Sequence, residues 1–433
     1  MAQDTYLNYG KEQVRVSADN IDLQGVLKVA AVPALTDALG DLKEALANPI
    51  GSPPLKEIVS AGEKVAVIVN DDTRVANTDV FLPYLLEEIM AGGVLKEDIT
   101  IVFANGTHRL LPEETMKQLI GEDIYHDYRI INHDCKDKDN LVYIGETSRG
   151  NRVEISRFVQ EADKTILTGS IVYHFFAGYG GGRKALVPGV AGYDTILFNH
   201  RLMLSPGAEL ARLEGNPVHE DLLEAVALAK PDFLLNTVLN DKKEFLGFFA
   251  GHYVEAHAKA CELVDQAYGT PIKETCELVI ASCGGYPKDL NLYQAQKTLD
   301  NAVRAVSPGG VVILMAQCLE GFGSSVLEEW LDKYSSPEEI YEAVRKNFII
   351  GGHKAYALTK HTEKARIIMV SDLPPDKVEK VYFTPARSLE EAIVLAGHHL
   401  GKSKPAAYLM PQGSLTLPRM DCETHVNAPA PKI

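Results

Sequence analysis

Cysteine is scarce in this sequence, and its spacing excludes the usual cysteine-based sites. Six cysteines occur among 433 residues, and no two of them form a Cys-x-x-Cys pair. A disulfide framework needs a denser set in a shorter chain, and a cysteine-built zinc site needs closely spaced pairs. We therefore expect free thiols in a reducing compartment.

Positive charge and long apolar segments are scarce too. Lys and Arg number 43 against 59 Asp and Glu, a formal net charge of -16, which disfavours phosphate backbones and anionic lipids. No apolar run reaches the roughly 20 residues that span a bilayer, and the N-terminus lacks a basic segment followed by an apolar one. The sequence predicts a cytoplasmic protein with neither nucleic acid nor membrane among its partners.

The two commonest glycine-rich nucleotide motifs are missing. The segment GYGGGRK ends at Lys184, but Arg183 separates that lysine from the last glycine, and Ala185 replaces the hydroxyl residue that holds magnesium in a P-loop. No Gly-x-Gly-x-x-Gly opens a first strand-to-helix turn with an acidic residue downstream. This absence counts against a nicotinamide-dependent hydroxyacid dehydrogenase, which remains a rival hypothesis.

What the sequence does contain is the alternation of strands and helices typical of an α/β protein. Its 46% hydrophobic content and mean hydropathy of -0.07 are those of a globular enzyme. Apolar runs predict buried strands at residues 64–70, 99–105, 164–172, 277–285 and 309–318. Amphipathic segments predict helices at residues 80–93, 111–121, 292–306 and 336–348. We therefore predict two α/β domains with mostly parallel sheets and an active site in the cleft between them.

The domain boundary is expected near residue 270, where a turn precedes a second strand–helix–strand series. The chain is also longer than one hydrophobic core usually fills. Residues 1–270 then form the N-terminal domain, and residues 271–417 form the C-terminal domain. The last strand, in residues 406–418, and the tail 418–433 are expected to return to the N-terminal domain.

Polar or glycine-rich segments follow several predicted strands. In open α/β sheets, ligands bind beyond the carboxyl ends of the strands, where several loops converge. The segments are NDDTR at 70–74, ANGTHR at 104–109, YHFFAGYGGGRK at 173–184 and SCGGYPKDLNLYQAQK at 282–297. We expect them to build one composite site.

Two histidines stand in these segments. His108 and His174 each follow a predicted strand, where an imidazole can act as a base near neutral pH. A packing or capping role is the alternative for each. His200, on a predicted helix after the glycine-rich loop, is either a metal ligand or a helix-face residue, because no closely spaced ligand set accompanies it.

The loop lysine and its flanking glycines have two interpretations. Glycines allow a backbone to approach an anion closely, which suits Gly180, Gly181 and Gly182 to a phosphate-bearing ligand. Lys184 is then either a phosphate clamp or a desolvated amine that reacts with, or carries, a cofactor. Composition alone favours the clamp.

Further polar residues are suited to binding a carboxylate. Arg74 can hold one bidentately, and Asp71 either positions a ligand or base or caps the next helix. Gln294 and Lys297 are three residues apart on a predicted helix, so they share a face and either reach a ligand or are solvated.

Taken together, these segments resemble the nickel-pincer lactate racemase family of 2-hydroxyacid racemases. The resemblance runs from about residue 10 to residue 420. Its motifs are long and follow the family's order. They are DDTR, GTHR, YHFFAGYGGGRKALVPG, NHR and GGYPKDLNLYQAQKTLDNA.

The resemblance implies a role for each candidate residue. It implies that Lys184 covalently carries a pyridinium-3,5-bisthiocarboxylate mononucleotide that holds nickel(II), and that His200 is the protein ligand to the metal. The other implied assignments are catalysis by His108 and His174, cofactor contacts from Asp71, Asp72, Thr73, Arg74, Gly180, Gly181 and Gly182, and substrate contacts from Arg74, Gln294 and Lys297.

The implied reaction interconverts D- and L-lactate by hydride transfer through pyruvate, with cofactor-maturation enzymes as partners. Removing the α-hydrogen as hydride avoids a poorly stabilised carbanion beside the carboxylate. The only tryptophan, Trp330, lies outside the matched motifs, so another 2-hydroxy acid is the alternative substrate. A non-enzymatic nucleotide-binding or metal-storage protein is the rival from a different class.

Overall fold

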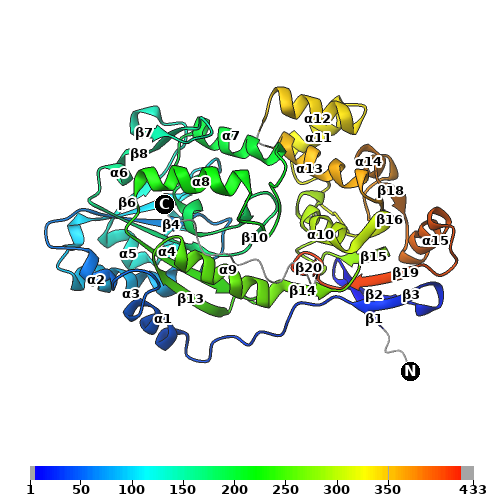
Figure 1. Ribbon diagram of the computed structural model, residues 1–433, viewed down its shortest axis with the longest axis horizontal. Coiled ribbons are helices and arrows are strands. Elements are labelled where there is room, and N and C mark those ends of the chain that lie inside the picture. The colour runs from blue at the N-terminus through cyan, green and yellow to red at the C-terminus, as the bar shows by residue number, and fades with distance from the viewer. Residues whose placement is uncertain (1–4, 350, 421–433) are drawn as a thin grey trace. The chain divides into compact units, whose positions relative to one another are not determined.

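The computed structural model describes residues 5–349 and 351–420, which form two compact units (Figure 1). The central unit comprises residues 32–266, and the terminal unit comprises residues 5–31 and 267–420. Each unit has its own six-stranded sheet in which parallel pairs predominate. The α/β fold with mostly parallel sheets predicted from the sequence is confirmed.

In the central unit, five parallel strands are joined by one antiparallel edge strand. In spatial order the strands are β13 (Phe245–Gly251), β12 (Phe233–Leu239), β9 (Lys164–Ser170), β4 (Val65–Asn70), β5 (Ile99–Ala104) and β6 (Arg129–Asn132). All but the last residue of β4 are buried, which explains its uninterrupted apolar sequence. Two smaller hairpins pair β7 (Leu141–Glu146) with β8 (Arg152–Ser156), and β10 (Tyr173–His174) with β11 (Gly178–Tyr179).

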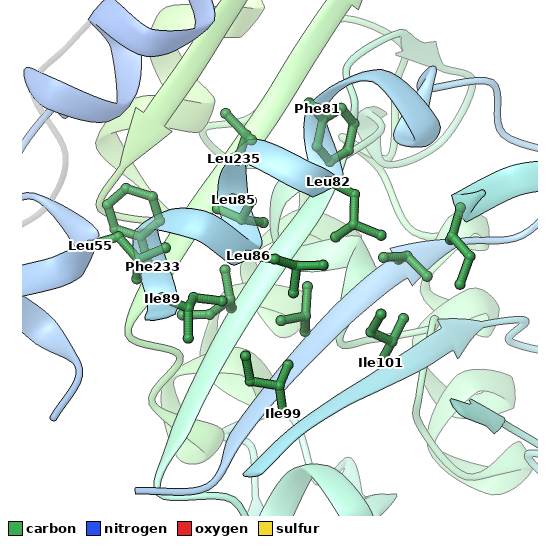
Figure 2. Close-up of a cluster of buried hydrophobic side chains, with 14 of the residues drawn as sticks. Leu55, Phe81, Leu82, Leu85, Leu86, Ile89, Ile99, Ile101, Phe233 and Leu235 are labelled. Carbon is green, nitrogen blue, oxygen red and sulfur yellow. The ribbon is translucent and has the colours of Figure 1, made fainter. Parts of the chain in front are cut away.

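Helices pack on this sheet or lie in the connections between its strands. They are α1 (Ala38–Ala47), α2 (Leu55–Ile58), α3 (Thr78–Ala91), α4 (Glu113–Ile120), α5 (Glu122–Asp127), α6 (Arg157–Gln160), α7 (Tyr193–Arg201), α8 (Pro217–Ala229) and α9 (Glu255–Tyr268). Helix α3 buries Leu82, Leu85, Leu86 and Ile89, whose spacing of three and four residues places them on one face. Figure 2 shows this face against strand residues that include Ile99, Ile101, Phe233 and Leu235. Each fully buried side chain of this kind contributes roughly 1.5–3 kcal/mol.

The strand order of the central sheet changes direction at β4. The chain runs from β4 to β5 and β6 on one side, and then returns to β9 and β12 on the other side. The carboxyl ends of β4, β5 and β9 therefore flank a topological switch point, the usual ligand position in an open α/β sheet. The segments after these three strands carry the candidate histidines and the loop lysine.

The terminal unit builds a second sheet from both ends of the chain. Its strands, in spatial order, are β18 (Thr384–Ala386), β17 (Arg366–Val370), β16 (Val306–Met315), β15 (Cys276–Ser282), β19 (Ala406–Met410) and β3 (Asp22–Val26). Two further pairs join β1 (Thr5–Tyr9) to β2 (Glu12–Val16), and β14 (Gly269–Ile272) to β20 (Leu417–Met420). Its helices are α10 (Leu292–Ala305), α11 (Ser325–Lys333), α12 (Pro337–Lys346), α13 (Gly352–Lys360), α14 (Pro375–Lys380) and α15 (Leu389–Leu400).

This division differs from the sequence-based domains at both ends of the chain. β3 pairs in parallel with β19, so residues 5–31 group with the terminal unit and not with the first domain. β19 and β20 also pair within the terminal unit and do not return to the first domain. Residues 421–433 of the predicted returning tail lie outside the described residues. A short strand carries no sequence signal for a partner hundreds of residues away, so its sheet could not be assigned.

Across residues 5–349 and 351–420, every helix is too short or too polar to cross a lipid bilayer.

Candidate active site

An aspartate–histidine pair forms where β4 and β5 end. The buried carboxylate of Asp71 lies 2.5 Å from Nδ1 of His108. Because a carboxylate only accepts hydrogen bonds, the His108 Nδ1–H donates, and the lone pair of the neutral ring is on Nε2. The Thr73 hydroxyl also donates to both Asp71 oxygens, at 2.9 and 3.0 Å. This arrangement prepares the half-exposed His108 to accept a proton at Nε2.

The same turn presents an exposed guanidinium. Arg74 donates from Nη1 to the carbonyl oxygen and the hydroxyl of Thr73, at 3.1 Å each. Its remaining N–H groups can hold a carboxylate. Asp72 forms a 2.5 Å ion pair with Arg109, which joins the segment after β4 to the segment after β5.

His174 is held by a tight hairpin after β9. β10 and β11 pair Tyr173 with Tyr179 and His174 with Gly178. At the tip, the Ala177 backbone N–H donates to Nδ1 of His174 at 3.3 Å. Nδ1 is therefore an acceptor, and the neutral ring carries its proton on Nε2. His174 and His108 thus have opposite tautomers.

The glycine-rich loop does not present all its amides to a ligand. The Gly180 N–H donates to the Val172 carbonyl at 2.7 Å, and the Gly182 N–H donates to Oδ1 of Asn236 at 2.8 Å. The expectation that these N–H groups face an anion is therefore wrong for these two positions. Gly181 and Gly182 are required instead by their positive φ and by neighbours that leave no room for a Cβ.

Lys184 follows in a short 3-10 turn and is partly buried. Burial, reinforced by the guanidiniums of Arg183 and Arg74, holds the pKa of Lys184 well below the ordinary 10.5. Its Nζ lies 3.4 Å from Nε2 of His174. Since the neutral His174 ring donates from Nε2, a neutral Lys184 amine accepts this contact. Both observations favour an uncharged, nucleophilic lysine.

A buried cation underlies this loop. Arg183 is 1% exposed and donates from Nη2 to the Ala177 and Tyr179 carbonyls at 3.0 and 3.1 Å, and from Nη1 to Nε2 of His257 at 2.7 Å. Burial, with the neighbouring Arg183, lowers the pKa of His257 to about 3, so this ring is a neutral acceptor. The guanidinium fixes the loop backbone and disfavours a second positive charge on Lys184.

One phenylalanine ring brings the lysine and two histidines together. The centroid of the buried Phe176 ring lies 4.5 Å from that of His174 and 5.1 Å from that of His200. Nζ of Lys184 lies 5.6 Å from the same centroid. The three side chains that the resemblance assigned to base, metal ligand and tether therefore surround Phe176.

Helix α7 places His200 in this cluster. The neighbouring Asn199 donates to the buried Asp221 at 2.8 Å and to the Val218 carbonyl at 3.1 Å, which anchors the end of α7 to α8. Over the part of the chain that the structure describes, no three His, Cys, Asp or Glu side chains are grouped to hold a metal ion. Among the described residues His200 thus belongs to no three-residue ligand set, and a bound molecule can supply further ligands to a metal there.

The lowered pKa of Lys184 predicts unusual reactivity. A lysine whose pKa lies below 10.5 becomes a neutral nucleophile at lower pH, so acylation of Lys184 in unmodified protein should begin at lower pH than that of the exposed Lys56. Peptide mass spectrometry after brief acetic anhydride treatment across pH 6–11 measures both rates. Equal pH profiles for the two lysines would contradict a desolvated amine.

The central unit therefore brings together nearly all the predicted residues. Gln294 and Lys297 are the exceptions, because they lie on α10 of the terminal unit, where Nζ of Lys297 donates to Oε1 of Gln294 at 3.0 Å. From the sequence, neither His257 nor Arg183 was assigned a functional role. One sequence feature could have pointed to Arg183: it directly precedes the loop lysine, Lys184.

Comparison with known proteins identifies the family of the chain. Residues 9–211 match the model of the lactate racemase N-terminal domain, and residues 272–415 match that of the lactate racemase C-terminal domain. A lactate racemase of Thermoanaerobacterium thermosaccharolyticum is 32% identical over 397 residues, which cover 90% of this chain and 93% of the relative. The chain belongs to the lactate racemase family.

Other members and solved structures extend the comparison. A lactate racemase of Lactiplantibacillus plantarum is also 32% identical over 397 residues, covering 89% of this chain and 93% of that family member. The structure of the T. thermosaccharolyticum lactate racemase apoprotein matches with a TM-score of 0.87 and 30% identity, over 96% of this chain and 100% of that one. A Thermotoga maritima protein, 19% identical with a TM-score of 0.63 over 91% of this chain and 100% of its own, shares the fold.

Proposed function

We propose that the protein interconverts D- and L-lactate by hydride transfer at the α-carbon, through pyruvate. The observation that carries this proposal is the cluster around Phe176, where a lysine with a lowered pKa meets His174 and His200. The family's members at 32% identity are lactate racemases, which supports the substrate.

The side chains of the cluster fit the cofactor that the resemblance implies. Lys184 would hold this group through a thioamide, formed when its neutral amine condenses with one thiocarboxylate and water leaves, and His200 would offer one imidazole to nickel(II). When bound, this group would supply the hydride acceptor and donor that the α-carbon needs in both directions. Its attachment requires maturation enzymes, which we propose as partners.

His108 is the proton acceptor in one direction. Asp71 holds its Nδ1–H, so the Nε2 lone pair can take the hydroxyl proton of one lactate enantiomer as the carbonyl forms. The carboxylate also stabilises the resulting imidazolium. In this assignment Asp71 acts through His108, in addition to any contact with the cofactor.

His174 is the proton donor in the same direction. Its Nε2 carries a proton because Nδ1 accepts from the Ala177 N–H, so the neutral ring can donate a hydrogen bond to the carbonyl oxygen of pyruvate. After taking a second proton from solvent, the His174 imidazolium can give one proton to that oxygen as the second enantiomer forms, and it then returns to the neutral ring. In the reverse direction the two histidines exchange roles. Two bases fit a racemase because the enantiomers direct their hydroxyls differently when each presents its α-hydrogen to the same acceptor.

The carboxylate of the substrate needs a cationic partner. Arg74 is exposed beside the Asp71–His108 pair and has N–H groups beyond those bonded to Thr73. We propose Gln294 and Lys297 as further substrate contacts, from α10. Another 2-hydroxy acid is the second candidate substrate. Trp330 is 8% exposed and packs beside Tyr334 in the terminal unit, so we assign no indole to the wall of the substrate pocket.

The decisive experiment uses protein produced with the maturation enzymes. Pure L-lactate and pure D-lactate should each become a racemic mixture without added nicotinamide. Intact-protein and peptide mass spectrometry should place one modification on Lys184, and metal analysis should find one nickel per chain. Racemisation by nickel-free protein with an unmodified Lys184 would overturn the cofactor assignment, and net reduction of added nicotinamide would favour the dehydrogenase.

A further inference from the structure

One face of helix α9 contacts the glycine-rich loop and the hairpin that carries His174. His257, Cys261 and Asp265 are spaced by four residues, so they form a single stripe along the helix. At one end of the stripe, Nε2 of His257 accepts from Arg183 beneath the glycine-rich loop, and at 3.7 Å it also approaches Sγ of Cys261. At the other end, Asp265 reaches the hairpin that holds His174.

Asp265 bridges the two strands of that hairpin. One carboxylate oxygen, Oδ1, accepts from the Tyr173 hydroxyl at 2.8 Å and from the Tyr179 hydroxyl at 2.7 Å. Tyr173 and Tyr179 are direct cross-strand partners, with ring centroids 5.4 Å apart. A single oxygen therefore fixes both strands at the register position beside His174 and Gly178.

The register of the hairpin determines the position of His174. The Ala177 N–H can reach Nδ1 of His174 only while the tip keeps its turn, and this bond sets the tautomer that places a proton on Nε2. The Tyr179 N–H also bonds to the Ala177 carbonyl, so the residue that Asp265 anchors belongs to the same turn. Movement of either tyrosine is transmitted to the ring of His174.

We propose that Asp265 is a positioning residue that fixes the tautomer and orientation of His174 through the paired hydroxyls of Tyr173 and Tyr179. Its effect on turnover rests on the proposed function, because it assumes that His174 exchanges a proton with substrate. Its effect on the imidazole does not depend on turnover.

The physical chemistry of the tyrosines supports this role. Burial, followed by the charge of Asp265, raises the pKa of Tyr179, so its hydroxyl remains a donor throughout the working pH range. Without the carboxylate, two partly buried hydroxyls would lose a strong acceptor, which favours their rearrangement. An asparagine at this position keeps an acceptor oxygen, whereas an alanine does not.

The first experiment uses cofactor-free protein and makes no use of activity. Histidine is labelled with ¹⁵N, and the His174 signals are assigned by difference from a His174→Gln sample. In the wild type, the shifts should show Nδ1 as acceptor and Nε2 as protonated. Asp265→Ala should move both signals toward the average of two tautomers, and Asp265→Asn should restore them. Unchanged His174 signals in Asp265→Ala would overturn the inference.

The second experiment uses cofactor-loaded protein. Asp265→Ala should lower kcat by about 10- to 100-fold, the usual cost of misplacing a catalytic group by about 1 Å, with KM and Lys184 modification within about twofold of wild type. Asp265→Asn should retain kcat within about threefold. The matched control is Glu262→Gln, which removes a carboxylate of α9 that pairs with Lys259 and should leave kcat unchanged.

A third variant removes the same bonds from the other side. Tyr173→Phe with Tyr179→Phe should reproduce the Asp265→Ala defect, and adding Asp265→Ala to this pair should cause little further loss. The double tyrosine variant also replaces Asp265→Ala in this test if Asp265→Ala fails to fold. Additive losses, or an Asp265→Asn variant as deficient as Asp265→Ala, would overturn the hydrogen-bonding role. If the wild-type protein fails to racemise lactate, the proposed function is wrong. The ¹⁵N signals of His174 still test whether Asp265 positions its ring.

Discussion

Replacing Lys184 with arginine is expected to yield folded protein without covalent modification and without racemase activity, even from a host with the maturation enzymes. Arginine keeps a long cationic side chain but cannot supply a neutral amine, because its guanidinium stays protonated. The whole rate enhancement should therefore be lost, which for enzymes is typically at least about 10⁶-fold. Chiral chromatography of lactate and peptide mass spectrometry measure the two losses.

The control for this variant is an equally conservative change outside the site. Lys259→Arg, on the exposed face of α9 and paired with Glu262, should remain modified at Lys184 and fully active. A Lys184→Arg protein that still racemises lactate would show that Lys184 is a clamp and not the covalent tether. That result would restore the interpretation that composition alone favoured.

Replacement of each catalytic histidine is expected to give complementary losses. His108→Gln and His174→Gln should each lower the racemisation kcat by about 10²- to 10⁴-fold, the usual contribution of a positioned acid or base, while Lys184 stays modified. In each variant only one histidine remains to accept a hydroxyl proton, so each variant should retain proton removal from only one lactate enantiomer.

A single-turnover experiment separates these half-reactions. Acid quenching of loaded enzyme with one pure enantiomer should release pyruvate from D-lactate in one variant and from L-lactate in the other. His126→Gln, on the exposed face of α5, is the control and should behave as wild type. Pyruvate from the same enantiomer in both variants would contradict the division of labour between the two histidines.

The strands, and the edge of the sheet at which the candidate residues lie, could be predicted from the sequence. Uninterrupted runs such as VAVIVN predict buried parallel strands, and polar residues after such strands fall at one edge of the sheet. This reasoning predicted that His108, His174 and Lys184 lie in segments after such strands, and in the structure they follow β5 and β9. The family resemblance then supplied the chemistry that composition left open.

The pairing of side chains was not accessible in the same way. The contact between Asp71 and His108 depends on the register of β4 against β5, which aligns Asn70 with Ala104. The residues of the two strands alone do not predict that register. Likewise, Gly180 and Gly182 look like anion-binding positions until the structure shows their N–H groups bonded to Val172 and Asn236.

The residues that support the hairpin and the glycine-rich loop from α9 escaped prediction for a related reason. His257 and Asp265 belong to a helix that the sequence marks only by its amphipathic spacing, and their partners lie about 75–90 residues earlier. A histidine or aspartate on a helix is usually a solvated or packing residue. Only its tertiary contacts show that such a residue supports the glycine-rich loop or the hairpin of His174.

The pairing of β3 with β19 has a consequence for synthesis of the chain on the ribosome. Residues 32–266 are contiguous, so the central unit can complete its sheet while the chain is still being made. β19 begins about 380 residues after β3 ends, which is about 20–80 s of elongation at about 5–20 residues per second. β3 therefore has no strand to pair with until β19, nearly the last strand of its sheet, has been synthesised.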